Sequence, residues 1–291
     1  MILANIFLDR AVVKFSEQSF EKPYDYAILE ETKMTIDAFK NYIKDGRPNP
    51  EPKFRPGVRE MTMAGLKADL IWVNDVSKFE DYVSSLRYAT TNGVIFTKPG
   101  VIIDKNYDPT KRLWFENALN NKGKLTLTTP YLDPFGAGFL VDIVHSLYEG
   151  KSSRQHDASD EVVAVLDASL DLFRFYRLFT EVYPECREKY RCFIMDKSGF
   201  LIMHNSFTDF ETVSDLKKLA ENIGNTHITM KEKSVAEDMI KKKILYRKKC
   251  KDFKNITNNI FYEVKVSGNL LITKNCPKYQ IAPLKGTTAY L

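Results

Sequence analysis

The chain has 291 residues, of which 44% are hydrophobic and 28% are charged, and its formal net charge at pH 7 is +5. This length predicts two domains of ordinary size, or one domain made of two similar halves. The charged fraction argues against a membrane-embedded protein, and no uninterrupted apolar run approaches the ~18 residues that a spanning helix needs. The N-terminus shows neither a basic region nor a small-residue cleavage site, so we read no signal peptide there.

The first part of the chain predicts an extension followed by a linker. The sequence DAFKNYIKDG is typical of the end of an amphipathic helix that stops at Gly46. Residues 47–57 contain four prolines, and such a density keeps a segment extended. We therefore assign residues 1–57 to an N-terminal extension and a proline-rich linker. Helical spacing returns from Val58 to about Trp72, and a second helix is predicted over Lys78–Leu86.

The middle of the chain changes to a period of two, which is typical of strands. Two apolar runs surround Asn92-Gly93, a dipeptide that favours a type I′ hairpin turn, and the strand pattern continues to Ile103. A turn over Asp108–Arg112 leads into a short helix, Leu113–Asn120. The remaining antiparallel strands of this part are predicted at Lys124–Thr129, Gly138–Ser146 and Glu161–Asp167.

A strong apolar helix is predicted over Ser169–Tyr183, with Ser169 as its N-cap. A strand pair follows, Arg191–Asp196 and Phe200–His204. Residues 211–250 have a helical pattern, and residues 260–291 predict at least two more strands. Helices and antiparallel strands in this order indicate an α+β fold. We assign the two domains to residues 58–183 and 184–291, and we expect the second domain to be truncated.

One set of side chains suggests a ligand. Tyr107, Arg112, Trp114 and Phe115 lie close together in the sequence, and Tyr131 and Asp167 follow. An α-amino acid needs a planar two-pronged donor for its carboxylate, which Arg supplies, and an anion with aromatic faces for its ammonium. Each residue also has a structural interpretation: Arg112 pairing with Asp108 or Asp104, the aromatic rings in the core, Tyr131 in a turn, and Asp167 as a helix cap.

The cysteines, a glycosylation sequon and a basic run give weaker predictions. Cys186 and Cys192 could close a small loop, and Cys250 and Cys276 could bridge the last helix and hairpin, although four free buried thiols would look the same. Asn255 begins a glycosylation sequon. The basic run Lys241–Lys254 favours a solvated helix face over nucleic-acid binding. No pattern assembles a nucleophile with a base, so we expect no enzyme, no cofactor and no metal site.

Several segments resemble a known family. GVIFTKPG, YDPTKRLWFENAL, VVAVLDASLDLF and CFIMDKSGFLIMH are similar to double Cache domains, which are extracellular PAS-like sensor modules. The most similar branch comprises the alpha-2-delta auxiliary subunits of voltage-gated calcium channels and the related von Willebrand A and Cache domain-containing modulators. This resemblance implies a long N-terminal helix followed by two PAS-like antiparallel-sheet modules.

The resemblance also implies a function and a place. Some double Cache domains carry an amino-acid-binding motif. Tyr107, Arg112 and Trp114 match its spacing, Tyr131 and Asp167 match it approximately, and Phe115 replaces a tyrosine. An amino acid or related zwitterion would be the ligand, and a calcium channel pore subunit would be the partner. The chain would then be a fragment of a longer protein on the extracellular face of the plasma membrane. The alternative is a structural interaction domain whose pocket is vestigial.

Overall fold

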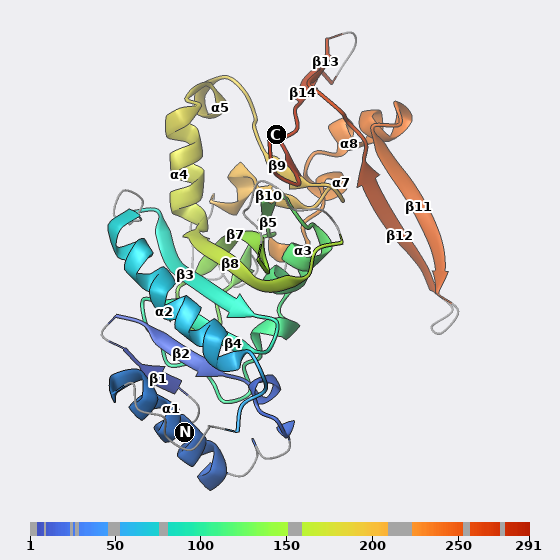
Figure 1. Ribbon diagram of the computed structural model, residues 1–291. Coiled ribbons are helices and arrows are strands. Elements are labelled where there is room, and N and C mark those ends of the chain that lie inside the picture. Colours follow the sequence, from blue (N-terminus) through green and yellow to red (C-terminus); the bar gives the residue numbers. More distant parts are fainter. Residues whose placement is uncertain are drawn as a thin grey trace. The chain divides into compact units, whose positions relative to one another are not determined.

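The computed structural model describes residues 5–8, 10–23, 26, 29–45, 53–75, 81–150, 159–208, 223–252, 257–273 and 277–291. The helices, with three-residue 3-10 helices marked η, are η1 (Glu17–Ser19), α1 (Leu29–Asp45), α2 (Val58–Asp75), η4 (Pro109–Lys111), α3 (Leu113–Asn120), α4 (Leu172–Val182), α5 (Glu185–Glu188), η5 (Asn205–Phe207), η6 (Ile223–Asn225), α7 (Ile228–Lys231) and α8 (Lys233–Lys241) (Figure 1). The strands are β1 (Asn5–Phe7), β2 (Val12–Phe15), β3 (Val83–Thr90), β4 (Val94–Lys98), β5 (Thr126–Leu127), β6 (Tyr131–Leu132), β7 (Phe139–Tyr148), β8 (Val162–Asp171), β9 (Ile194–Asp196), β10 (Leu201–Met203), β11 (Leu245–Asp252), β12 (Thr257–Val264), β13 (Leu270–Ile272), β14 (Tyr279–Ile281) and β15 (Ala289–Tyr290).

The chain forms two compact units. Unit 1 consists of residues 1–123, 134–136 and 144–169, and unit 2 consists of residues 124–133, 137–143 and 170–291. Strands β7 and β8 contribute residues to both units. The division of the chain into residues 1–57, 58–183 and 184–291 stays a prediction.

Unit 1 is built on a sheet in which β1, β2, β4, β3, β8 and β7 are neighbours in that order. The pairs β1–β2, β2–β4 and β3–β4 are antiparallel. The sequence did not suggest β1 and β2, because short apolar runs mixed with charges carry little periodicity. Strand β2 pairs with β4, which lies about 80 residues further along the chain, and β1 pairs with β2. Tertiary packing, and not a local pattern, therefore determines where these two strands lie in the sheet.

Both faces of this sheet are covered. On one face, Phe15, Tyr88 and Phe96 pack against Phe39 of α1 and Val58 of α2. Figure 1 shows α2 lying across β3 and β4, and a side chain at Gly65 of α2 would come within 3.1 Å of the Tyr88 ring. Burying each large apolar side chain in this way contributes about 1.5–3 kcal/mol.

On the opposite face, the alternate residues of the same strands pack against α3. These include Val12, Ala89, Ile95 and Val165, which contact Trp114, Phe115 and Ala118 of the helix. Because successive strand residues point to opposite faces, Arg87, two before Ala89, and Asp167, two after Val165, also lie on the α3 side.

Three predictions in unit 1 are corrected by the structure. The predicted helix Lys78–Leu86 is wrong from residue 83 onward, where β3 begins; residues 76–80 lie outside the described ranges. The hairpin at Asn92-Gly93 exists, but it has a three-residue loop in which only Gly93 has a positive φ, of 84°. A type I′ turn needs two positive φ values, so the loop belongs to the longer class that ends on a left-handed glycine. The strand pattern expected at Val101–Ile103 is irregular backbone.

Unit 2 contains the three-stranded sheet β10-β9-β15, and β5 and β6 adjoin the start of β7. Its core is formed by apolar side chains that include Phe139, Leu172, Ile194, Met203 and Phe207. Two histidines, His204 and His227, cap the short helices η5 and α7. In each case Nδ1 accepts a hydrogen bond from a backbone N–H two residues later, at 3.1 and 3.2 Å.

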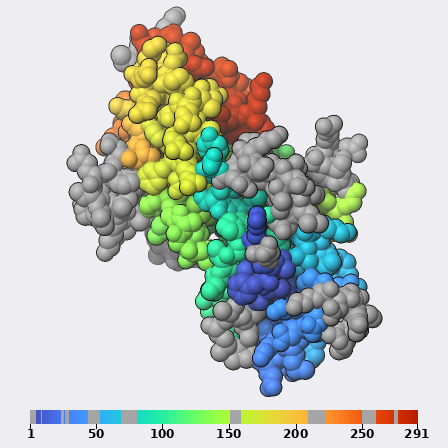
Figure 2. All heavy atoms as spheres, turned by 90° about the vertical axis from the view of Figure 1, so that its left-hand side faces the viewer, coloured from blue at the N-terminus to red at the C-terminus, as the bar shows by residue number. Residues whose placement is uncertain are grey.

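The helix predicted over Ser169–Tyr183 is shorter than expected. It runs from Leu172 to Val182, and its N-cap is Asp171, whose carboxylate accepts from the Arg174 N–H at 2.9 Å. Ser169 continues strand β8 instead, because its hydroxyl is engaged inside unit 1. Helix α4 and the following α5 are exposed on the face shown in Figure 2.

The region expected to be helical over 211–250 is helical only in part. Residues 209–222 lie outside the described ranges, α7 and α8 cover 228–241, and β11 then begins at Leu245. The combination of helices with antiparallel sheets is confirmed. The long N-terminal helix and the arrangement as two PAS-like modules stay predictions. Within the described ranges, no helix is both long enough and apolar enough to cross a membrane.

Candidate functional site

The candidate site of unit 1 is positioned by the loop that leads into α3. Asp108 is the N-cap of η4, and its carboxylate accepts hydrogen bonds from the Thr110 N–H at 3.0 Å and the Thr110 hydroxyl at 2.7 Å. Pro109 fits the first turn because it needs no N–H donor there. Helix α3 then begins at Leu113, with the bounds that the sequence predicted. As a result, Tyr107 and Trp114 are buried, while Arg112 stays at the surface.

Arg112 lies over the ring of Tyr107. Its guanidinium carbon is 4.2 Å from the ring centre, which is a cation–π contact worth about 0.5–2 kcal/mol. Among the described residues, Arg112 forms no ion pair with Asp108 or Asp104; Lys111 contacts Asp108 instead, at 3.3 Å. The exposed guanidinium is therefore stacked against an aromatic ring.

Asp167 is paired with an arginine that the sequence did not single out. Arg87 of β3 donates from Nε to Oδ2 of Asp167 and from Nη2 to the hydroxyl of Ser169, across the neighbouring strands β3 and β8. The two side chains are 5% and 0% exposed. Such complete burial is tolerated only because each charge is paired and hydrogen-bonded. The Arg87 guanidinium also lies 5.2 Å from the ring centre of Trp114.

The sequence contained a weak signal for Arg87. In the strand pattern around Tyr88, the alternation places Arg87 on the same face as Ala89, where a charge needs a partner. Nothing local could identify that partner, because Asp167 lies 80 residues further along. Ser169 was missed for the same reason: we interpreted it as a helix cap.

The electrostatics of the site follow from burial. Burial raises the pKa of the Tyr107 hydroxyl. The positive charges of Arg87 and Arg112 and a hydrogen bond from Trp114 oppose this shift, and Asp167 adds to it. Tyr107 is thus a neutral hydroxyl at physiological pH, in direct contact with the charged groups of the site.

The loop that carries Tyr107 is fixed by a buried lysine. Lys14 of β2 donates from Nζ to the Phe15 carbonyl at 3.0 Å, the Tyr26 hydroxyl at 2.5 Å and the Lys105 carbonyl at 3.2 Å. Tyr26 in turn donates to the Lys105 carbonyl at 2.7 Å. All three ammonium donors are therefore used. Burial lowers the pKa of Lys14 to about 8, against the opposing effect of Asp104.

The other two predicted residues have different surroundings. Phe115 is 1% exposed and packs in the core under α3, with its ring 5.7 Å from that of Trp114. Tyr131 belongs to unit 2, where its hydroxyl donates to Asp142 at 3.1 Å. The structure thus brings Tyr107, Arg112, Trp114 and Asp167 together within one unit. Their role as ligand contacts stays a prediction.

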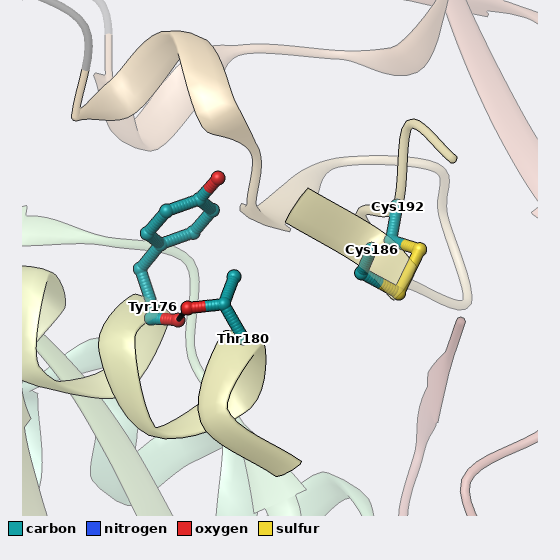
Figure 3. The surroundings of a disulfide bond; sticks show 4 residues. All are labelled: Tyr176, Thr180, Cys186 and Cys192. Atoms are coloured by element: carbon teal, nitrogen blue, oxygen red, sulfur yellow. Dashed lines mark hydrogen bonds between the residues drawn. A yellow bond between two sulfur atoms is a disulfide. The ribbon is translucent and has the colours of Figure 1, made fainter. Parts of the chain in front are cut away.

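A disulfide joins Cys186 and Cys192, which closes the short loop after α5 (Figure 3). In the same view, Thr180 of α4 donates its hydroxyl proton to the Tyr176 carbonyl one turn earlier, at 3.1 Å. The suggested pairing of Cys250 with Cys276 and the sequon at Asn255 fall outside the described residues and side chains. A disulfide of this kind is typical of an oxidising compartment.

Comparison with known proteins identifies a relative of this chain. The chain is 27% identical over 308 aligned residues to the VWFA and cache domain-containing protein CG16868 of Drosophila melanogaster. The match covers 97% of this chain, which spans about a fifth (20%) of the length of that curated relative.

Solved structures with low similarity are bacterial ligand-binding domains. One is that of the Pseudomonas fluorescens chemoreceptor CtaA in complex with L-isoleucine, with a TM-score of 0.40, 12% identity, and coverage of 92% of this chain and 84% of that one. Another is that of the Pseudomonas aeruginosa amino acid chemoreceptor PctB in complex with L-Arg, with a TM-score of 0.37, 15% identity, and coverage of 63% and 66%.

A family model assigns the chain directly. The model of the CACHD1 central domain matches residues 4–173, more than half of the chain and nearly all of unit 1. The resemblance to Cache domain-containing proteins is confirmed by this match and by the relative from Drosophila. The chain therefore belongs to the CACHD1 central-domain family.

Proposed function

We propose that this chain is an extracellular module that binds a small amino-acid-like ligand, without chemistry, as part of a longer membrane-associated protein. The observation that carries the proposal is the convergence of Arg112, Tyr107, Trp114 and the Arg87–Asp167 pair on the α3 side of the unit 1 sheet. Two guanidinium groups and two aromatic rings are in contact there: the exposed Arg112 stacks on Tyr107, and the buried Arg87 lies over Trp114.

The ligand would be bound by charge and by stacking. Its carboxylate would dock on Arg112, whose planar fork can donate two parallel hydrogen bonds. Its ammonium would be attracted by Asp167 and by the faces of Tyr107 and Trp114. Because Asp167 already accepts from Arg87, Arg87 acts as a positioning residue that holds the carboxylate in place.

A thermal-shift screen of the twenty amino acids and common amines tests the proposal. A ligand at a hundred times its Kd stabilises the folded state by about 2.7 kcal/mol, which is readily measured as a rise in Tm. Arg112→Ala should abolish the rise, and Arg112→Lys should retain only part of it because an ammonium cannot form the two-pronged contact.

Arg59→Ala is the matched control. Arg59 stacks on Tyr42 at 4.7 Å in the same unit, so this substitution removes a comparable cation–π contact away from the site. Its ligand-induced shift should equal that of the unchanged protein. An unaltered shift in Arg112→Ala would exclude Arg112 as the carboxylate-binding residue.

A second candidate function is a structural interaction domain with a vestigial pocket. Two observations favour it: Asp167 is already paired inside the unit, and Phe115 provides a ring without a hydroxyl. In that case the surface would engage a channel pore subunit, as the resemblance to alpha-2-delta proteins suggests. No amino acid at millimolar concentration would then change the Tm.

A further inference from the structure

We propose that the β11–β12 ribbon of unit 2 binds a sulfated linear polysaccharide. This site is separate from the candidate ligand site of unit 1. The ribbon consists of two eight-residue antiparallel strands paired from Leu245↔Val264 to Asp252↔Thr257, and among the described strands neither pairs with a third. Figure 1 shows it following α8.

The ribbon is anchored at its base and exposed beyond it. Leu245 and Val264, the first cross-strand pair, are buried, and the Val264 N–H donates to the Lys197 carbonyl at 2.7 Å. The ring of Tyr262 lies 4.5 Å from that of His227. From Tyr246 onward, the described side chains of β11 are exposed. A base that is already packed before binding has less conformational freedom to lose, which lowers the entropic cost of binding.

The charge of this segment is concentrated and only partly neutralised. Seven basic residues occur between Lys241 and Lys251. Lys242 pairs with Asp238, and Lys248 pairs with Glu263, each at 2.5 Å. Among the side chains that the structure describes, Arg247 and Lys249 have no carboxylate within 4.0 Å.

Arg247 and Lys249 project from the same face of the ribbon, because they are two residues apart in one strand. Their cross-strand partners on that face are Tyr262 and Ile260. Two cations one strand repeat apart, roughly 7 Å, present a short row of charge to a polymer with regularly spaced anions.

Exposed apolar side chains on the ribbon favour a binding role over a role in preventing aggregation. Lysines on an unpaired strand commonly serve to prevent edge-to-edge aggregation. Here Ile260, on the face of Arg247 and Lys249, is 42% exposed, and Phe261, across from Lys248 on the opposite face, is 53% exposed, which works against that purpose. Ile260 therefore offers an exposed apolar contact beside the two cations on the proposed binding face.

The cellular compartment of the protein indicates which class of polyanion the ribbon would bind. The Cys186–Cys192 disulfide of the same unit is typical of an oxidising environment, which argues against nucleic acid as the partner. The strongly anionic membrane leaflet faces the cytoplasm, which argues against lipid headgroups. Sulfated polysaccharides remain, and lysine- and arginine-rich segments of five to eight residues are a recognised heparin-binding pattern.

Heparin binding by the full chain tests the proposal. The variant Arg247→Ala/Lys249→Ala should bind roughly 2–30-fold more weakly, if each exposed ion pair contributes about 0.2–1 kcal/mol. The slope of log Kd against log salt should become shallower by about 1.5, since each released counterion contributes roughly 0.7–0.9 in other polyanions. Both residues are exposed, so the fold and the Tm should be retained.

Lys231→Ala/Lys285→Ala is the control, because it removes the same charge from exposed positions of unit 2 outside the ribbon. Equal loss of heparin binding in both variants would show a net-charge effect and overturn the proposal. Tighter binding to single-stranded RNA or to phosphatidylserine vesicles than to heparin at equal salt would also overturn it. No retention of the unchanged protein on heparin would do the same.

Discussion

Removing the guanidinium of Arg87 should destabilise unit 1 more than any surface substitution. Arg87→Met keeps much of the side-chain volume, but it leaves the carboxylate of Asp167, which is 0% exposed, without the Arg87 guanidinium. Breaking a buried ion pair in this way costs about 3–5 kcal/mol. The lost hydrogen bond to Ser169 and the lost contact with Trp114 act in the same direction. For a unit of this size, the expected decrease in Tm is roughly 6–20 °C.

A double-mutant cycle in urea separates the pair from its surroundings. Asp167→Leu alone should be destabilising, because it leaves the buried Arg87 charge without its carboxylate partner. The loss of unfolding free energy in Arg87→Met/Asp167→Leu should be smaller than the sum of the losses in the two single variants, by more than about 2 kcal/mol. The dependence of the unfolding free energy on urea concentration should have the same slope in all variants if only stability changes. A cost below about 1 kcal/mol for Arg87→Met would refute the reasoning, since it would mean that Asp167 is not held by this guanidinium.

Two further predictions concern pH. Burial lowers the pKa of His204 and of His227 below the ordinary 6.5. The contribution of these two histidines to the unfolding free energy of unit 2 should therefore be fully present above pH 6.5 and decrease as the pH falls below it. The reason is that a protonated ring cannot accept the capping hydrogen bond at Nδ1. Urea titrations of His204→Asn/His227→Asn, whose amide oxygens can still accept, should show a weaker decrease between pH 7 and 5; an equally steep one would exclude the histidines. Lys14 has a pKa lowered to about 8 from 10.5, so the folded state disfavours its charge. Stability should rise between pH 8 and 9.5 in the unchanged protein and stay level in Lys14→Met, whereas parallel profiles would contradict the assignment.

Local signals in the sequence specify several elements of this protein. The bounds of α3 follow from the Asp108 turn, with its capping carboxylate and a proline that fits the first helical turn. The β3–β4 hairpin follows from two alternating runs around a glycine that can adopt a positive φ. These features depend on hydrogen bonds and backbone preferences within a few residues, which is why the pattern alone could predict them.

The candidate site was predicted only in part. Tyr107, Arg112 and Trp114 lie within eight residues, so the turn and the start of α3 determine their proximity. The position of Asp167 next to these residues required β3 and β8 to be neighbours. Arg87 and Ser169 were not predicted as parts of the site, because their importance comes from their partners and not from their own neighbours in the sequence.

What the sequence alone determined is therefore the residue types, the alternation that turns Arg87 and Asp167 toward one face, and the helix that places Trp114 above them. The tertiary structure decided which strands are adjacent, and therefore that Arg87 pairs with Asp167. The physical reason is that a buried carboxylate must have a partner but can obtain it from any strand beside it. Strand order is set by the packing of both faces of the sheet, including α1, α2 and the two N-terminal strands, and this information is distributed over the whole of unit 1.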